Sequence, residues 1–116
     1  MSVTVTCEGM VNPSNATDKA NVESTVVEGR TLELRQGNIN GVQYCWTRLS
    51  NAHDGDCVWL DISGDGGTTW TQCGKRILQA GGRDYTDAQR TSSSSQMCMR
   101  ASTQLVGPKY QTASWC

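Results

Sequence analysis

The sequence predicts an all-β fold: a single antiparallel β-sandwich or small barrel, stabilised by disulfides. Short strand-like segments alternate with turn signals about every eight to twelve residues, and no segment has a sustained helical period. The clearest pair of strands flanks a glycine-rich turn at residues 64–67. Six cysteines accompany a hydrophobic fraction of only 36% and no Phe, so we expect a modest core to need covalent support.

The whole chain, residues 1–116, is expected to form one domain, because it contains no internal repeat and no linker. Its formal net charge of −1 and the lack of a basic run argue against a nucleic-acid partner. No apolar run is long enough to insert into a membrane. The cysteines predict an oxidising compartment, so we expect a secreted, extracellular domain whose signal peptide is absent from this sequence.

The first half of the chain predicts four strands. Residues 2–7 alternate apolar and polar side chains, which is typical of a half-buried strand. Residues 8–21 show no period and predict an irregular, mobile loop. Three further strands are expected at 22–27, 30–36 and 42–49, separated by turns at 28–29 and 37–41. The last of them carries large side chains on both faces, as strands covered on both sides do.

Residues 57–73 predict a β-hairpin with arms at 58–62 and 68–71. Its turn, Gly64-Asp65-Gly66-Gly67, combines glycines that reach positive φ with an aspartate that accepts backbone hydrogen bonds. Weaker strand signals follow the hairpin, at 75–79, 83–88, 96–101 and 108–116, with a polar loop at 91–95.

The six cysteines are better read as disulfides than as a zinc site, because there is no C-x-x-C pair and only one His. Free buried thiols are the alternative. If the strand at 42–49 pairs with the strand after it, Cys45 and Cys57 lie nearly opposite at a spacing that suits a bridge. Cys57 and Cys73 would also lie nearly opposite, so the two pairings compete. We prefer the first, and the expected set is then Cys45–Cys57, Cys73–Cys98 and Cys7–Cys116.

Residues 63–70 read S-G-D-G-G-T-T-W and match the Asp-box pattern S-x-D-x-G-x-T-W at every fixed position. The segment resembles the hairpins of sialidase-type propellers and other secreted β-proteins, where the motif is a folding element remote from catalysis. The resemblance implies a structural role for Asp65, Gly66, Gly67 and Trp70. A propeller needs repeated copies, and this chain has one.

Three segments, at 42–49, 56–74 and 97–101, are similar to a family of small secreted domains from actinobacteria such as Streptomyces. That pattern is roughly V-W-L-D-x-S-x-D-G-G-x-T-W, then an R-A segment and a final W-W. Here the chain ends in Trp-Cys, and Cys45 and Cys57 stand where apolar residues are expected, as a bridge between facing positions would require. The resemblance covers about half the chain and implies secretion and a β fold. It implies little about activity, because such domains occur alone and beside glycosidase or lectin-like modules.

Catalytic and metal-binding constellations are weakly supported, so we expect neither an enzyme nor a cofactor. The single histidine, His53, lies in a predicted loop, and no G-x-S-x-G elbow accompanies it. Asp61 with Asp65 or Glu33 could form a glycosidase pair, but the sequence does not give their separation. Turn formation also explains the possible calcium ligands, which lack EF-hand spacing: Asp54, Asp56, Asp61 and Asp65.

A binding module for carbohydrate or a cell-envelope glycan is the function we expect. Sugar C–H faces stack on Trp and Tyr, while polar side chains bond the hydroxyl groups. The candidate residues are Tyr44, Trp46, Trp59, Arg83, Tyr85, Arg90 and Trp115. In a chain without Phe, each Trp could equally belong to the core. The alternative is a protein adaptor or inhibitor subunit, for example in a secreted antibacterial toxin assembly, which docks by a strand edge or through residues 8–21.

Overall fold

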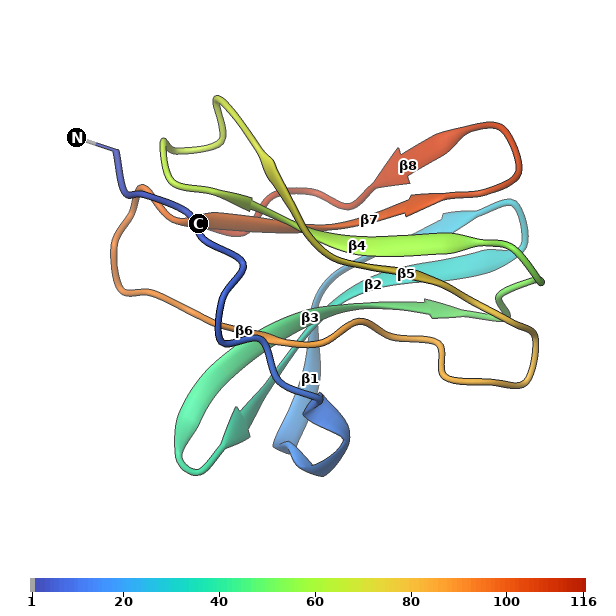
Figure 1. Ribbon diagram of the computed structural model, residues 1–116, viewed down its shortest axis with the longest axis horizontal. Helices are drawn as coiled ribbons and strands as arrows, with labels where there is room; N and C mark the ends of the chain where they lie inside the picture. The colour runs from blue at the N-terminus through green and yellow to red at the C-terminus, as the bar shows by residue number, and fades with distance from the viewer. Residues whose placement is uncertain (1) are drawn as a thin grey trace.

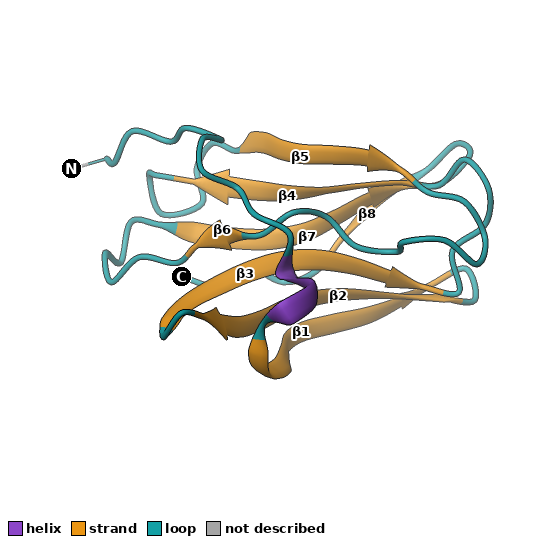
Figure 2. Ribbon diagram, turned by 60° about the horizontal axis from the view of Figure 1, so that its bottom comes forward, coloured by secondary structure: helices purple, strands orange, loops and turns teal. Residues whose placement is uncertain are grey.

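The computed structural model describes residues 2–116 as a two-layer β-sandwich (Figures 1 and 2). Two four-stranded antiparallel sheets have the strand orders β1-β2-β3-β6 and β5-β4-β7-β8. The all-β, disulfide-stabilised sandwich is therefore confirmed. The elements described are η1 (Pro13–Asn15), β1 (Thr17–Val27), β2 (Arg30–Ile39), β3 (Val42–Ser50), β4 (Cys57–Ser63), β5 (Thr71–Ile77), β6 (Gln89–Arg90), β7 (Cys98–Gln104) and β8 (Lys109–Gln111).

The first sheet is built from two tight hairpins. Both turns, at residues 28–29 and 40–41, have positive φ at each of their two positions, which is the geometry that two-residue hairpin loops require. Glycine occupies the second position of each turn, where positive φ carries no steric cost. The turn predicted at 37–41 is shorter than expected because β2 continues to Ile39. Strand β1 begins at Thr17, five residues earlier than predicted.

Strands β3 and β4 lie in different sheets, so the connection at residues 51–56 crosses from one layer to the other. A buried ion pair holds this crossing in place. Arg30 Nε donates to Asp56 Oδ2 at 2.7 Å, and the same carboxylate oxygen accepts the His53 backbone N–H at 2.8 Å. The expected pairing of strand 42–49 with strand 57–63 is therefore wrong, since β4 pairs with β5 and β7 instead.

The predicted hairpin at 57–73 is present as β4 and β5, with a longer turn than expected. Residues 68–70 belong to the turn rather than to the second arm, because the Asp65 carboxylate binds the backbone N–H groups of Thr68 and Thr69. Strand β5 then runs to Ile77, so most of the weak strand predicted at 75–79 is its second half.

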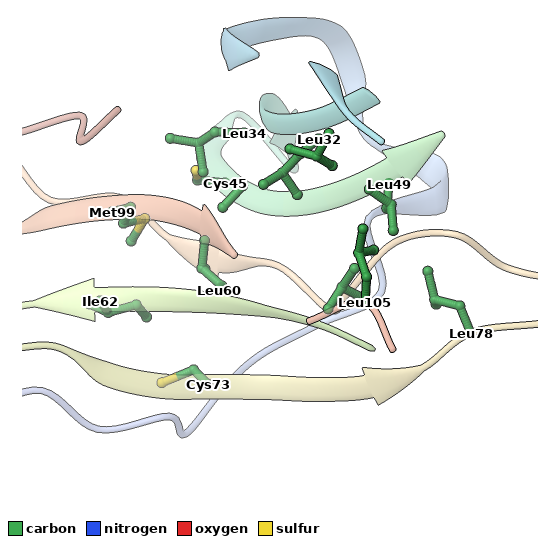
Figure 3. Packing of buried hydrophobic residues seen from close by; sticks show 13 residues of the cluster. Leu32, Leu34, Cys45, Leu49, Leu60, Ile62, Cys73, Leu78, Met99 and Leu105 are labelled. Carbon is green, nitrogen blue, oxygen red and sulfur yellow. The ribbon is translucent and has the colours of Figure 1, made fainter. Parts of the chain in front are cut away.

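The core lies between the two sheets, where inward-facing side chains of both layers meet (Figure 3). The inward faces of the long strands alternate with outward polar residues, as expected for a sandwich. The central members are Leu32, Leu34, Cys45, Leu49, Val58, Leu60, Ile62, Leu78, Met99 and Leu105. Trp46 and Trp59 are buried but alternate with these residues, so they point to the outer faces of their sheets.

The N-terminal segment differs from its prediction. Residues 2–7 form no strand, although Val3 N donates to Gly64 O and so ties the segment to the β4–β5 turn. Residues 2–7 do not pair with a neighbouring strand along their length, so their alternation of apolar and polar side chains does not produce a strand, and Val3 is 40% exposed. Residues 8–21, predicted as an irregular loop, contain η1 and the start of β1. The Asn12 side chain caps η1 by accepting the Ser14 N–H at 2.9 Å.

Two disulfides are formed, and all three expected pairings are wrong. Cys7 bonds Cys73 of β5, which attaches the N-terminal segment to that strand. Cys116 bonds Cys98, because the chain end returns to form a β-bridge next to that position. The expected bridges were Cys45–Cys57, Cys73–Cys98 and Cys7–Cys116.

The two remaining cysteines, Cys45 and Cys57, are free and buried. They are not opposite each other because their strands belong to different sheets, and Cys45 faces the core while Cys57 alternates with the core residues of β4. Desolvation by burial raises the pKa of the Cys45 thiol far above its usual range, so this group stays protonated.

The C-terminal half contains fewer strand residues than predicted. Within 83–88 only two isolated bridges form, Tyr85 with Arg48 and Ala88 with Val11, and the short β6 follows them. The strand expected at 96–101 is β7, shifted towards the C-terminus. In 108–116 only β8 and a bridge from Trp115 to Met99 are formed. Across residues 2–116, no helix has the length and apolar character needed to span a membrane.

Candidate functional site

A concave pocket of about 280 Å³ lies on the outer face of the β1-β2-β3-β6 sheet. Strands β2 and β3 form its base, and two non-strand segments, η1 and residues 84–85, form its sides. The lining combines aromatic and charged side chains: Pro13, Ser14, Lys19, Arg35, Trp46, Arg48, Asp84 and Tyr85.

Trp46 forms the aromatic base of the pocket. It is opposite Arg35 in the β2–β3 ladder and is only 3% exposed. Its indole lies over Gly37, where an added Cβ would be 3.0 Å from the Trp46 Cη2 atom and 3.1 Å from the Ala16 Cβ atom. Glycine at position 37 therefore makes room for the indole between β2 and the start of β1.

One side of the pocket comes from η1 and an irregular start of β1. The register of β1 against β2 shifts between Thr17 and Ala20, and Asp18 adopts a positive φ of 54°. Such a bulge redirects the side chains next to it. Lys19, inside the bulge, donates from Nζ to the Ser14 carbonyl oxygen at 2.9 Å. The bulge thus places an exposed ammonium group at the pocket's edge.

The other side is the segment at 84–86, which runs beside β3. Leu49 N donates to Asp84 O, and Thr86 N donates to Thr47 O, both at 2.9 Å. The Arg83 guanidinium lies 4.5 Å from the centre of the Tyr85 ring, and its Nε donates to Tyr85 O at 2.9 Å. One face of the Tyr85 ring is therefore occupied by Arg83, which fixes the ring at the pocket wall.

The charges of the pocket are only partly compensated within the protein. Its lining contains three cations and one anion, on a chain whose formal net charge is −1. Arg35 donates from Nη1 to Asn21 Oδ1 at 2.6 Å, and Arg48 donates from Nε to Asp84 Oδ2 at 3.3 Å. Among the described residues each guanidinium makes one side-chain hydrogen bond, out of five N–H groups.

A buried carboxylate, Glu33, lies beside the two arginines, opposite Arg48 in the β2–β3 ladder. Its oxygens accept hydrogen bonds from Asn21 at 2.7 Å and Ser50 at 3.3 Å. Its distances to Arg35 Nη1 and Arg48 Nη1 are 4.0 and 3.9 Å, beyond hydrogen-bonding range. Glu33 therefore orients the arginines by charge while leaving their N–H groups available at the pocket.

A second cluster of aromatic and charged side chains lies on the outer face of the other sheet. The Asp61 carboxylate accepts from Trp59 Nε1 at 2.8 Å, Arg100 Nε at 2.9 Å and Ser102 Oγ at 2.7 Å. The Arg100 guanidinium lies 4.1 Å from the centre of the Trp70 ring. Trp59, Asp61, Trp70 and Arg100 come from the V-W-L-D, T-W and R-A parts of the sequence pattern, and Ser102 follows directly after the last of these.

The turn that joins β4 and β5 is organised by Asp65. Its carboxylate accepts from Ser63 Oγ at 2.7 Å, Thr69 Oγ1 at 2.6 Å and Thr69 N at 2.9 Å. These bonds, led by the one from the Thr69 hydroxyl, lower the pKa of Asp65 to about 2. Gly66 and Gly67 adopt φ of 73° and 94°, which requires glycine at this bend.

The structure brings Trp46 and Tyr85 together in the pocket and places the other predicted binding residues elsewhere. Arg83 lies behind the Tyr85 ring, while Tyr44 and Arg90 face each other in the β3–β6 ladder. Trp59 belongs to the Asp61 cluster. Trp115 lines a separate pocket of about 80 Å³, together with Met97 and Met99.

The sequence analysis missed six lining residues, of which four are charged: Lys19, Arg35, Arg48 and Asp84. A signal existed for two of the charged residues. Arg35 and Arg48 alternate outward with Trp46 on strands that the sequence predicts correctly. Lys19 carried no such signal, because a bulge determines where its side chain points.

None of the Trp and Tyr side chains in the described chain is fully exposed; each is buried or half-buried. A flat platform of exposed aromatic rings, the arrangement that would favour stacking of a sugar on an open surface, is therefore not found in residues 2–116. A ligand of this site would instead be held inside the pocket.

The possible calcium ligands lie at four separate places. Asp54 accepts from the Ala80 N–H, Asp56 pairs with Arg30, and the other two, Asp61 and Asp65, have the partners already described. Over residues 2–116, no group of three or more His, Cys, Asp or Glu side chains gathers as a set of metal ligands. The His53 side chain is exposed on the connection between the sheets.

Comparison with known proteins adds no relative: no family model matches the chain, and neither the curated proteins nor the solved structures contain a significant match.

Proposed function

We propose that this protein is a secreted, non-catalytic binding module that recognises carbohydrate through the pocket on the β1-β2-β3-β6 sheet. The observation that supports this most strongly is the combination of a Trp46 base and a Tyr85 wall with several charged donors around a concave site. Sugars present both apolar C–H faces and hydroxyl groups, so a binding site needs both kinds of partner. The two disulfides agree with an extracellular location.

The size of the pocket limits how much ligand it accommodates. Its volume of about 280 Å³ lies near the lower end of the range for small-molecule sites, roughly 300–1,000 Å³. We therefore expect the pocket to hold one sugar unit or one chain end, with the rest of a glycan outside it.

A glycan array followed by titration of the best ligand tests this function. Tyr85→Ala removes the half-buried aromatic wall and should abolish detectable binding. Tyr44→Ala is the matched control, because Tyr44 is also a half-buried tyrosine on this sheet but does not line the pocket. Equal binding by Tyr85→Ala and the unmodified protein, or silence of the array, would contradict the proposal. Thermal unfolding of each variant checks that the fold is retained.

A protein adaptor or inhibitor remains the second candidate, and the edge of the first sheet favours it. Strand β1 is an eleven-residue edge strand, and Val26 on it is 74% exposed. Such an edge can pair with a strand of another chain. A stable partner recovered from the culture medium of the source organism, and lost on Val26→Lys, would favour this function, provided that the glycan array is silent.

A further inference from the structure

We infer that the sugar held by this pocket is acidic and that its carboxylate binds between Lys19, Arg35 and Arg48. This inference rests on the proposed function and adds the substrate class. It comes from the charges around the pocket: the three cations of the lining face two carboxylates, Asp84 in the lining and Glu33 about 4 Å from both arginines, so one positive charge is in excess.

Most N–H groups of the two pocket arginines remain available to a ligand. An arginine has five N–H groups in a planar fork that matches a carboxylate, and each pocket arginine uses one of them for a side-chain hydrogen bond. A fold that needed these arginines only for its own ion pairs would bring carboxylates within bonding distance of both forks. Instead, Glu33 stays 4.0 and 3.9 Å from Arg35 and Arg48, and only Arg48 has a carboxylate within bonding distance, Asp84 at 3.3 Å from its Nε.

The two pocket arginines lie in an environment that is partly shielded from water. The Arg35 side chain is 17% exposed and the Arg48 side chain 39% exposed, so both are partly shielded from water by the pocket walls. Charge–charge attraction is stronger where water is partly excluded, and hydrogen bonds to charged acceptors are stronger than neutral ones. A carboxylate entering the pocket would therefore gain more there than at an exposed arginine.

The single anion of the lining, Asp84, has acceptor positions that remain available. Asp84 is 30% exposed and makes one contact with Arg48 at 3.3 Å, which is long for a charged pair. Its remaining acceptor positions can bind a sugar hydroxyl next to the carboxylate. The lining thus fits a ligand that has both an acid group and hydroxyl groups, which is the chemistry of a uronic or sialic acid unit.

The experiment compares acidic sugars with neutral counterparts by titration. The probes are an oligogalacturonate and its methyl ester, and sialyllactose and lactose. At least one acidic member should bind about tenfold or more tightly than its neutral counterpart, because a hydrogen bond to a charged group is stronger than a neutral one by this order. This preference should decrease as salt is raised, since screening weakens the attraction.

Two charge-removing variants and a control assign the effect to the pocket. Lys19→Gln and Arg48→Gln should each reduce the preference for the acid. Arg76→Gln changes the net charge equally but lies on β5, in the other sheet, and should leave it unchanged. Lys19 is exposed and bonds only one backbone carbonyl among its described contacts, so its replacement is not expected to affect folding.

The outcomes separate this inference from the proposed function. Equal binding of acidic and neutral sugars, with loss of both on Tyr85→Ala, overturns the inference and leaves the function standing. The inference also fails if Lys19→Gln and Arg48→Gln keep the full preference. Binding of none of the four sugars overturns the inference, and silence of the whole glycan array contradicts the proposed function as well. Binding of an oligoglutamate peptide alone would overturn the inference and assign the charged pocket to a protein partner.

Discussion

The outer faces of the two sheets carry similar residue types, but the polar side chains are hydrogen-bonded within the protein to different degrees. On the β5-β4-β7-β8 sheet, Asp61 accepts hydrogen bonds from three side chains, and Arg100 is stacked on Trp70. On the β1-β2-β3-β6 sheet, two arginines surround a concave space with most of their N–H groups available. A tryptophan with charged neighbours thus stabilises the fold on one face and, in our proposal, binds a ligand on the other.

The disulfides extend this comparison, because both attach a chain end to the second sheet. Cys7–Cys73 closes a loop of 66 residues and Cys98–Cys116 one of 18 residues. Chain-entropy arguments give stabilisations of about 4 and about 3 kcal/mol. We predict that Cys7→Ser with Cys73→Ser lowers the free energy of unfolding more than Cys98→Ser with Cys116→Ser. Urea unfolding measures this, and the reverse order would contradict the account of the second sheet.

Removal of one carboxylate from each face tests whether the side chains of the two faces differ in their hydrogen bonding within the protein. Asp61→Asn breaks a buried network of three donors and should lower the free energy of unfolding by about 3 kcal/mol. Asp84→Asn removes a partly exposed pair and should cost less than about 1 kcal/mol. Similar losses in urea unfolding would mean that the pocket face is as fully engaged in the fold as the other face.

The two arginine positions should give opposite results. Arg100→Gln loses the bond to Asp61 and the stacking on Trp70, so it should lower stability and leave sugar affinity unchanged. Arg48→Gln should weaken acidic-sugar binding about tenfold, equivalent to about 1.4 kcal/mol, with little change in melting temperature. Titration and thermal unfolding of both variants measure these opposite effects. A direct loss of sugar affinity in Arg100→Gln would contradict the prediction.

The smallest expected effect concerns acid stability at the β4–β5 turn. The folded protein lowers the pKa of Asp65 to about 2, so the contribution of this group is complete above about pH 4 and is lost as the pH falls through 2. Asp65→Asn should therefore melt below the unmodified protein at pH 5, and the gap should narrow towards pH 2. A constant gap between pH 5 and pH 2 would show that the charge of Asp65 does not matter.

Local chemistry allowed the sequence to predict the hairpins. The glycine at 29, the Asn-Gly pair at 40–41 and the Gly-Asp-Gly-Gly turn at 64–67 each specify a bend from neighbouring residues alone. The alternation on β2 likewise predicted its inward face, whereas β3 carries large side chains on both faces, so the sequence did not assign Trp46 to one of them.

Long-range geometry explains the errors. The sequence does not show that residues 51–56 cross from one sheet to the other. The expected Cys45–Cys57 bridge assumed that the two strands joined by this connection are neighbours in one sheet, which they are not. The alternation in residues 2–7 was misleading because no neighbouring strand extends a ladder to them. Lys19 lines the pocket because a bulge in β1 redirects its side chain. The register shift that makes this bulge depends on how β1 pairs with β2, which the sequence does not show.

The most direct test of the central claim is the response of the indole N–H groups of Trp46 and Trp59 in a heteronuclear NMR titration with oligogalacturonate. Trp46 lies at the base of the pocket, while the Trp59 N–H is bonded to Asp61 on the opposite face. We predict that the Trp46 signal shifts in a saturable way and that the Trp59 signal stays in place. A Trp59 shift without a Trp46 shift, or no shift of either signal at saturating sugar, would contradict the claim that the first sheet is the binding face.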